Sequence, residues 1–358
     1  MLLTVTGLSE SGHPAVLVAH EGGELKRRAS EGLRFIGLSP RSEVDIRAGW
    51  QLSRVLTDIQ PDVVHAHDPM AVSLAAMALQ MKPALRARPL VVASRRVDFH
   101  LKRHAFSRWK YGHVDVFIAA SRLIASILER DGIDPARIEV VHDGVNLASI
   151  DKQPPVDAHA TFWLPHGAPV VVNVAALAAH KGQRHLVAAA ARVVREVPDA
   201  RFVILGEGEL REALERQVRD LGLERHVTLP GFRPDVLGLL KTIDLFVMSS
   251  VTEGLGSAVL EAMACRRAVV STRAGGLPEA VVDGETGLLV PPHDEPALAK
   301  AIVTLLRDPG RRAALAERGR VRVEREFSVD RLVERTLDVY QRRLAGSYRD
   351  RRKAGTTP

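Results

Sequence analysis

The chain has 358 residues, of which 46% are hydrophobic and 26% charged, a composition typical of a folded globular protein. This length allows two domains, each with its own core. The single cysteine, Cys265, excludes an internal disulfide and suits a reducing cytosol. The formal net charge of +7 favours anionic partners in general.

No uninterrupted apolar stretch is long enough to cross a bilayer, and the N-terminus lacks the basic-then-apolar order of a secretion signal. We therefore expect a cytoplasmic protein. Segment 100–111 mixes basic residues with Phe106, Trp109 and Tyr111. That mixture is compatible with peripheral contact with an anionic membrane surface, while plain solvated charge is the default explanation. Nucleic acid is not an expected partner, because no zinc spacing, helix-turn-helix or aromatic RNA-binding motif accompanies the charge.

The first half of the chain opens with a helix-like segment over residues 2–8 and then alternates apolar runs with helical patterns. In a doubly wound domain the first strand and its glycine turn normally lie at the centre of the sheet, where ligand binds. Here a helix comes first, and the first strand and glycine loop are missing. Either the given start lies too late or this domain lacks a central strand, and we favour the former. The predicted strands are Ala15–Ala19, Leu33–Ile36, Val63–His65, Leu90–Ala93, Val116–Ala119 and Ile138–Val141.

A second set of strands follows the polar, proline-containing stretch 151–155, so we place a domain boundary near residues 150–165. Helix-period patterns over 183–197 and 210–222 separate these strands, and an amphipathic helix is expected over 329–344. Apolar strands alternating with helices predict two parallel sheets covered by helices. The predicted strands of the second set are Val170–Val174, Arg201–Leu205, Val227–Leu229, Leu245–Met248, Ala268–Ser271 and Gly287–Val290.

The most informative motif is the run from Glu253 to Glu261, which reads EGLGSAVLE and follows a predicted buried strand. The glycines predict a turn, and Ser257 is the expected capping residue of the next helix. A helix start presents unpaired N–H groups and the positive end of its dipole, which favours phosphate. Two carboxylates beside such an anion site suit the hydroxyl groups of a nucleotide-sugar. The alternative is an ordinary turn with Glu261 on the helix surface.

Several further motifs accompany this one in a fixed order. Together they resemble the retaining glycosyltransferases of family 4, also called glycosyl transferases group 1, over nearly the whole chain. That resemblance implies an α/β GT-B fold with two Rossmann-like domains facing a cleft. The motifs are Asp62–Asp68 (DVVHAHD), Ala119–Ser121 (AAS), Val140–Asn146 (VVHDGVN), His180–Gln183 (HKGQ), Leu205–Arg211 (LGEGELR), Glu253–Glu261, Gly275–Glu279 (GGLPE) and Asp283–Gly287 (DGETG).

The resemblance implies an acceptor-binding domain over residues 1–155 and a donor-binding domain over 156–328. Residues 329–358 would form a C-terminal helix packing back toward the first domain, with a basic tail. The same likeness predicts a donor site in which Glu253 and Lys181 are the catalytic pair, with Lys181 neutralising the leaving diphosphate. The other predicted donor contacts are Gly254, Leu255 and Gly256 to the distal phosphate, Glu261 to the ribose, and Gly231, Phe232 and Arg233 beside the base. The alternatives are a solvated turn lysine at 181 and a core phenylalanine at 232.

On the acceptor side, His65 and His67 alternate at a strand end and point the same way. We expect both to line the acceptor site, with a structural histidine as the alternative. Relatives often carry a histidine where this chain has Arg95 and Arg96, a change that suggests an anionic acceptor. No metal site and no cofactor are expected, since the chain lacks the Asp-x-Asp pair that holds a divalent ion on a sugar diphosphate.

The sequence thus predicts a metal-independent retaining hexosyltransferase that acts on a glycan, a lipid-linked acceptor or another hydroxyl acceptor, as in polysaccharide or lipopolysaccharide biosynthesis. One alternative is an N-terminally truncated, inactive protein that binds sugar nucleotides. Another keeps the fold but changes the reaction to epimerisation or phosphorolysis.

Overall fold

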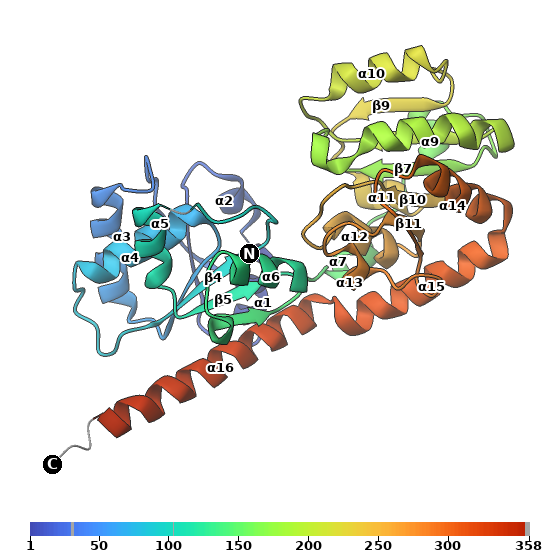
Figure 1. The fold of residues 1–358 in the computed structure, drawn as a ribbon. Coiled ribbons are helices and arrows are strands. Elements are labelled where there is room, and N and C mark those ends of the chain that lie inside the picture. The colour runs from blue at the N-terminus through green and yellow to red at the C-terminus, as the bar shows by residue number, and fades with distance from the viewer. Residues whose placement is uncertain (30–31, 103, 355–358) are drawn as a thin grey trace. The chain divides into compact units, whose positions relative to one another are not determined.

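The computed structural model describes residues 1–29, 32–102 and 104–354. The chain divides into two compact units (Figure 1). The first unit comprises residues 1–142 together with the C-terminal segment from Val329, and the second comprises residues 143–328. In the described part of the chain, no helix has the length and apolar character needed to cross a membrane.

The first unit contains two parallel sheets. Strands β1 (Val16–Ala19) and β2 (Arg34–Gly37) pair only with each other, while β3 (Val63–Ala66), β4 (Leu90–Arg95), β5 (Val116–Ala119) and β6 (Ile138–Val140) form a sheet in that order. Strand pairing therefore does not join β2 to β3, although the sequence pattern predicted one doubly wound sheet here. The helices before and between these strands are α1 (Leu2–Glu10), α2 (Glu24–Arg28), α3 (Ile46–Ile59), α4 (Pro69–Gln80), α5 (Ala105–Gly112) and α6 (Arg122–Arg130).

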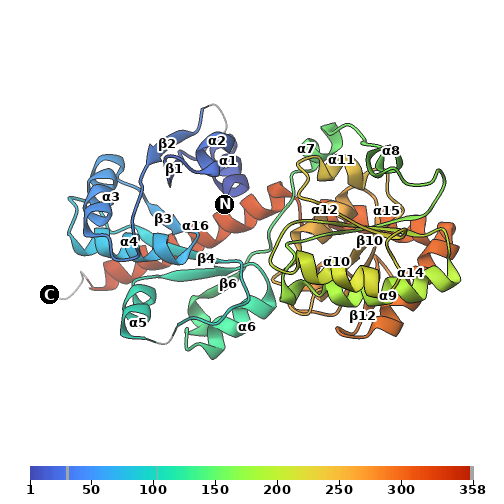
Figure 2. The ribbon, with the colours of Figure 1, turned by 90° about the horizontal axis from the view of Figure 1, so that it is seen from above.

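The C-terminal helix α16 (Val329–Ala354) packs on one face of the four-stranded sheet, next to β4 (Figure 2). Its residues Leu332, Val339 and Tyr340 join a core with strand residues such as Val92 and Val116. Helix α1 lies against the same helix, and a Cβ at Gly7 would come within 2.4 Å of a methyl group of Val333. The amphipathic pattern of α16 is thus explained by burial of its apolar side in the first unit.

The second unit has one six-stranded parallel sheet in the order β12-β11-β10-β7-β8-β9. The strands are β7 (Val170–Val174), β8 (Arg201–Leu205), β9 (Val227–Gly231), β10 (Leu245–Met248), β11 (Ala268–Thr272) and β12 (Leu288–Val290). The order reverses between β7 and β10, as in a doubly wound fold. The helices are α7 (Leu147–Lys152), α8 (Ala158–Phe162), α9 (Gln183–Glu196), α10 (Arg211–Asp220), α11 (Val236–Leu240), α12 (Ser257–Ala264), α13 (Leu277–Ala280), α14 (Glu295–Arg307) and α15 (Pro309–Glu326).

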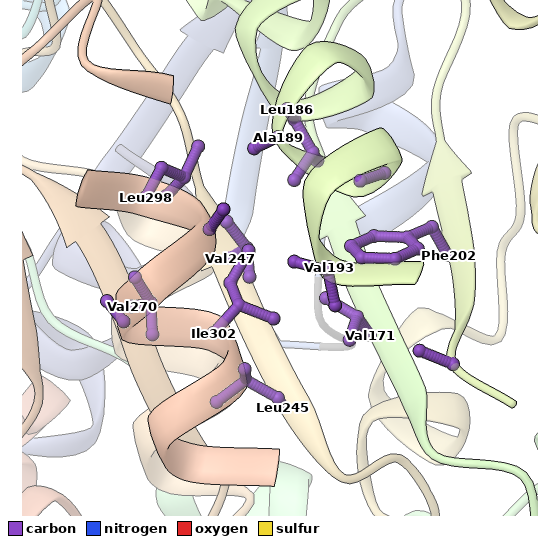
Figure 3. Close-up of a cluster of buried hydrophobic side chains, with 14 of the residues drawn as sticks. Val171, Leu186, Ala189, Val193, Phe202, Leu245, Val247, Val270, Leu298 and Ile302 are labelled. Carbon is purple, nitrogen blue, oxygen red and sulfur yellow. The ribbon is translucent and has the colours of Figure 1, made fainter. Parts of the chain in front are cut away.

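The core on one face of this sheet is built where α9 and α14 pack on the strands (Figure 3). Leu186 and Val193 of α9 and Ile302 of α14 meet Phe202 and Val247 of the sheet, and all are buried. Both sides of these strands are buried, which explains why their sequences are continuous apolar runs rather than alternating ones. This double burial makes the sheet a rigid support for the loops at its edge.

Each predicted strand is present, with bounds that differ by at most two residues at either end. The division between units falls after His142, earlier than the predicted boundary at 155. Segment 143–155 groups with the second unit because α7 packs on α12, and the Asp151 carboxylate receives two bonds of 2.9 and 2.8 Å from the Arg320 guanidinium on α15. A bidentate ion pair of this kind was not visible in the sequence pattern.

Candidate donor and acceptor sites

The candidate donor site lies in the second unit, at the carboxyl edge of the sheet where the strand order reverses. Ligands of doubly wound sheets bind at such switch points, because the loops there diverge to opposite faces. Strands β7 and β10 pair only through residues 171–172 and 245–246. Beyond them the buried Asn173 side chain continues the connection, as its Nδ2 donates to the Val247 carbonyl at 2.8 Å. The two strands therefore separate at this point, and their loops supply the site.

Those two loops bring Lys181 and Glu253 together. Lys181 follows β7, Glu253 follows β10, and the lysine Nζ lies 2.7 Å from Glu253 Oε2. The Ser250 hydroxyl donates to the same carboxylate oxygen at 3.0 Å. Both charged side chains are largely buried, with 19% and 12% of their surface exposed. The alternative of a solvated lysine at 181 is therefore wrong, since an ion pair at this depth is held in one geometry.

Glycines allow the two loops to approach closely. Gly275 has a φ of +58°, and a Cβ there would lie 1.9 Å from the Glu253 carbonyl oxygen. The neighbouring Gly276 N–H donates to that same carbonyl at 2.9 Å. Gly182, with a φ of +64°, would place a Cβ 2.2 Å from the Ser249 carbonyl. No residue with a side chain fits either position without moving the backbone that carries Glu253 or Lys181.

The loop after Glu253 leads into the first turn of α12. The predicted cap at Ser257 is wrong: Gly256, with a φ of +87°, is the cap residue, and Ser257 is the first helical residue. Glycine is used because the chain turns there through the left-handed region. Within the described residues, the backbone N–H groups of residues 254–258 have no recorded acceptor. The Leu255 side chain is buried in the core, so only its backbone is available for an anion.

Glu261 lies in the second turn of α12 and is partly buried. Burial raises the pKa of its carboxyl group above the usual value. Hydrogen bonds donated to a carboxylate enclosed in this way would stabilise its charged form, because burying a charge without hydrogen bonds costs free energy. This environment differs from that of the ordinary surface glutamate considered as the alternative.

The predicted base contacts lie at the end of β9, the outermost strand on that side of the sheet, at the same carboxyl edge as the loops after β7 and β10. Gly231 has a φ of +90°, and Phe232 directly after it is 71% exposed. The interpretation of Phe232 as a core residue is therefore wrong. The Arg233 guanidinium binds Asp235 through bonds of 2.9 and 2.6 Å. This ion pair holds Arg233 close to the strand end.

A second cluster lies in the first unit, at the carboxyl ends of β3 and β4. The His65 ring accepts or donates through both nitrogens, with Nδ1 2.5 Å from the Tyr340 hydroxyl and Nε2 2.7 Å from the Ser94 hydroxyl. The His67 ring stacks on it with a centroid separation of 4.1 Å. Tyr340 comes from α16, so the C-terminal helix orients a histidine of the strand end. The two predicted histidines thus do lie together.

Arg96 sets the tautomer of His67, and burial keeps both histidine rings neutral. Arg96 Nη1 lies 3.0 Å from His67 Nδ1. A guanidinium only donates, so this nitrogen accepts and the proton of neutral His67 is on Nε2. Burial, helped by the Arg96 charge, lowers the pKa of His65 to about 3, and burial holds the pKa of His67 well below 6.5. Arg95, in contrast, donates through Nη2 to the Phe99 carbonyl.

In the part of the chain that the structure describes, no group of three or more His, Cys, Asp or Glu side chains has the arrangement of a metal site. The free Cys265 is buried, and burial raises the pKa of its thiol to about 11, so the thiol stays protonated and unreactive at neutral pH.

Sequence reasoning missed Ser250, Asn173, Ser94 and Tyr340. Ser250 and Ser94 each follow or end a predicted strand, a position that could have drawn attention to them. Asn173 is a polar residue inside an otherwise apolar strand, which is also a recognisable signal. Nothing in the sequence connects Tyr340 to His65, because the two are 275 positions apart.

Comparison with known proteins defines the class. The fold matches a glycosyltransferase from Rickettsia africae ESF-5 with a TM-score of 0.81 and 20% identity, covering 96% of this chain and 93% of that one. It also matches Anabaena Alr3699/HepE in complex with UDP-glucose, with a TM-score of 0.77 and 20% identity, covering 95% and 94%. Two parallel α/β units of this kind define a protein of the GT-B fold.

Two family descriptions match successive parts of the chain. Glycosyltransferase Family 4 matches residues 1–149, and Glycosyl transferases group 1 matches residues 158–322. The chain belongs to this glycosyltransferase family, as the sequence motifs predicted.

Individual relatives agree with the family. EpsD of Bacillus subtilis (strain 168), which is named as a glycosyltransferase, is 29% identical over 320 residues, covering 84% of this chain and 82% of that protein. The D-inositol 3-phosphate glycosyltransferase of Salinispora tropica is 36% identical over 258 residues, and the match covers 65% of this chain. The chain spans only 53% of that relative's length, and 59% of a Mycolicibacterium smegmatis mannosyltransferase described as GDP-mannose-dependent.

Proposed function

We propose that this protein transfers a sugar from a nucleotide diphosphate sugar to a hydroxyl acceptor, with retention of the anomeric configuration and without a metal ion. The observation that carries the proposal is the ion pair between Lys181 and Glu253 at the switch point of the second unit. A lysine held beside a diphosphate stabilises the charge that grows on the leaving group. The glutamate both orients that lysine and offers an oxygen to the donor sugar.

The remaining donor contacts that we propose come from residues at the same carboxyl edge of the sheet. The N–H groups of residues 254–258 at the start of α12 suit the distal phosphate. The enclosed Glu261 carboxylate suits the ribose hydroxyls, and Phe232 offers an exposed ring on which a base can stack. Some similar proteins have been solved with UDP or UDP-glucose, which supports a nucleotide-sugar donor for this chain.

The acceptor is assigned to the first unit. His67 presents an N–H on Nε2, and Arg96 lies beside it as a fixed positive charge. This pair suits a hydroxyl acceptor that carries a nearby phosphate. A glycan or lipid-linked acceptor in polysaccharide or lipopolysaccharide assembly fits that requirement. Two relatives are named for such acceptors, a phosphatidylinositol monomannoside mannosyltransferase and a lipopolysaccharide core biosynthesis glycosyltransferase.

The proposal is tested with the purified full chain and a panel of UDP-, GDP-, ADP- and dTDP-sugars. One donor is expected to raise the melting temperature, since a ligand that binds only the folded state stabilises it. With that donor we expect slow hydrolysis that persists in EDTA and releases a sugar of unchanged anomeric configuration, read by proton NMR. Loss of activity in EDTA would contradict metal independence, and an inverted product would contradict retention. Donor binding without any turnover would instead favour the inactive sugar-nucleotide-binding protein.

A further inference from the structure

The first unit exposes large apolar side chains at one edge. Val44, Ile46 and Trp50 lie on the approach to α3 and in its first turns, and they are 57%, 69% and 55% exposed. Val97 and Phe99, in the segment after β4, are 44% and 61% exposed. Single exposed apolar residues are ordinary, but these five lie in two segments that approach each other. The hydrogen bond from Lys110 lowers the pKa of the Glu43 carboxyl, and the charge of Lys102, three residues after Phe99, lowers it further.

The exposed residues of α3 are not needed for its packing. The helix already buries Ala48, Leu52 and Leu56 in a core with α4. Its outer side carries Arg47, Trp50 and Arg54, and the Arg54 guanidinium lies 5.0 Å from the Trp50 ring centre. An aromatic ring flanked by arginines is a side-chain set that suits the boundary between lipid and water.

An ion pair between a buried lysine and a half-exposed glutamate fixes the approach to α3 against α5. Lys110 of α5, only 3% exposed, places its Nζ 2.6 Å from Glu43 Oε2 and 3.2 Å from the Pro69 carbonyl at the start of α4. The Ser73 hydroxyl donates to the same Glu43 oxygen at 3.3 Å. Glu43 immediately precedes the exposed Val44, so these contacts hold the two segments together.

Helix α5 adds aromatic and basic side chains. The rings of Phe106 and Trp109 stack at 5.4 Å, and His104 and His113 extend this column at its two ends. Lys102 and Arg108 are exposed, and the sequence from 99 to 114 contains no acidic residue. On the approach to α3, Glu43 is in the ion pair and Asp45 caps the helix. The other acids of these segments are Asp58, one turn after Arg54, and Asp98, between Val97 and Phe99.

Val97 and Phe99 directly follow the carboxyl end of β4, the edge of the sheet at which α4 begins. Glu43 lies close to that start of α4, because Lys110 Nζ contacts both Glu43 and the Pro69 carbonyl. His67 and Arg96 occupy the same edge. The patch is therefore on the side of the unit from which an acceptor would approach these groups.

We propose that Val44, Ile46, Trp50, Val97 and Phe99, with Arg47, Arg54, Lys102 and Arg108, form a membrane-contact surface that rests on anionic lipid headgroups. This surface differs from the one expected over segment 100–111, because Lys110 is buried and paired with Glu43 and most of the apolar contact comes from α3 and the loop after β4. Arg103 of that segment lies outside the described residues. Charge complementarity favours lipid over a second copy of this chain, whose matching surface would carry the same positive charge. The proposal of membrane binding does not depend on the proposed function, whereas a lipid-linked acceptor does.

The test is co-sedimentation of the full chain with vesicles of phosphatidylcholine alone and of phosphatidylcholine with phosphatidylglycerol. We expect binding only to the anionic vesicles, weakening as salt is added. Ile46→Ser/Trp50→Ser should reduce partitioning by at least about tenfold, since two apolar side chains are lost from the interface. Arg47→Gln/Arg54→Gln should reduce it by about thirtyfold, at about 1 kcal/mol for each charge.

Matched controls lie in the second unit. Leu221→Ser/Trp163→Ser removes two apolar side chains that are 44% and 92% exposed, and Arg216→Gln/Arg219→Gln removes two exposed arginines of α10. Both controls should bind vesicles like the parent chain.

The proposal is overturned if the parent chain does not bind anionic vesicles or if the α3 variants bind as well as the controls. It is also overturned if the α3 variants convert a dimer to a monomer in size-exclusion chromatography without changing vesicle binding. Thermal shifts with the donor panel test the proposed glycosyltransferase function separately from the membrane-contact surface, because donor binding can persist when membrane binding fails.

Discussion

The Nζ of Lys181 and the Oε2 of Glu253 lie 2.7 Å apart although 72 positions separate the two residues. Their strands, β7 and β10, are neighbours in the sheet at the point where its order reverses. The loop after β10 is bonded to both of its neighbours: the Val251 N–H donates to the His180 carbonyl of the loop after β7 at 2.8 Å, and the Gly276 N–H of the loop after β11 donates to the Glu253 carbonyl. The pair is thus positioned before any donor arrives, and preorganisation of this kind supplies much of an enzyme's electrostatic stabilisation.

Lys181→Ala should slow turnover more than it weakens donor binding, because the charge on the leaving diphosphate grows in the transition state. We expect kcat to fall by about 10²- to 10³-fold and the donor dissociation constant to rise by less than about tenfold. Single-turnover kinetics and calorimetry measure the two quantities. Lys300→Ala, which removes an exposed lysine of α14, is the control. Equal losses in rate and affinity would contradict the assigned role.

Glu261→Gln and Glu261→Ala should both weaken donor binding. A carboxylate that accepts hydrogen bonds from two ribose hydroxyls contributes more than a neutral acceptor, so we expect about a tenfold loss of affinity for the alanine variant. Calorimetry with the free nucleoside diphosphate isolates this contribution from the sugar. Glu212→Ala, on the exposed side of α10, serves as control. An unchanged nucleotide affinity would remove Glu261 from the site.

Gly275→Ala should damage the site through the backbone. The new Cβ would meet the Glu253 carbonyl oxygen, so either the loop moves or the fold is strained. We expect a large loss of kcat/KM together with a lower melting temperature. Gly222→Ala is the matched control, because its φ of +65° is similar to the +58° of Gly275 and its Cβ meets nothing within 4 Å. That control should lose only about 1 kcal/mol of stability and keep its activity.

Stability should fall as the pH drops below the ordinary histidine pKa of 6.5. The folded chain keeps His65 neutral down to about pH 3, whereas the unfolded chain protonates it from about 6.5. Between these values the unfolded state binds more protons, so the free energy of unfolding falls by up to about 1.4 kcal/mol per pH unit for this group. His65→Asn should flatten the dependence in urea unfolding from pH 7 to pH 4. The exposed His166→Asn should leave it unchanged, and a steep profile in both variants would exclude His65 as its origin.

Much of the architecture was accessible from the sequence. The strand at Leu245–Met248 was predicted with its observed bounds, because a short continuous apolar run between turn residues has few other interpretations. The sequence did not predict that β1 and β2 form a sheet separate from β3–β6. Strand pairing depends on long-range contacts that no local pattern specifies. The cap of α12 was misplaced by one residue, because the positive φ of Gly256 outweighs the usual preference for serine at that position.

The sequence by itself indicated the residues for which we propose chemistry in this protein: the glycine turn with Glu253 and Glu261, the lysine after β7, and the histidines at the end of β3. These are local signals, written in side-chain type and spacing along one segment. Only the tertiary structure decided which groups meet, so that Lys181 joins Glu253, Tyr340 orients His65, and Lys110 is withdrawn into an ion pair with Glu43. The reason is physical: burial and distance are properties of segments brought together by the fold, and the pKa values and charges that matter at these sites follow from that packing.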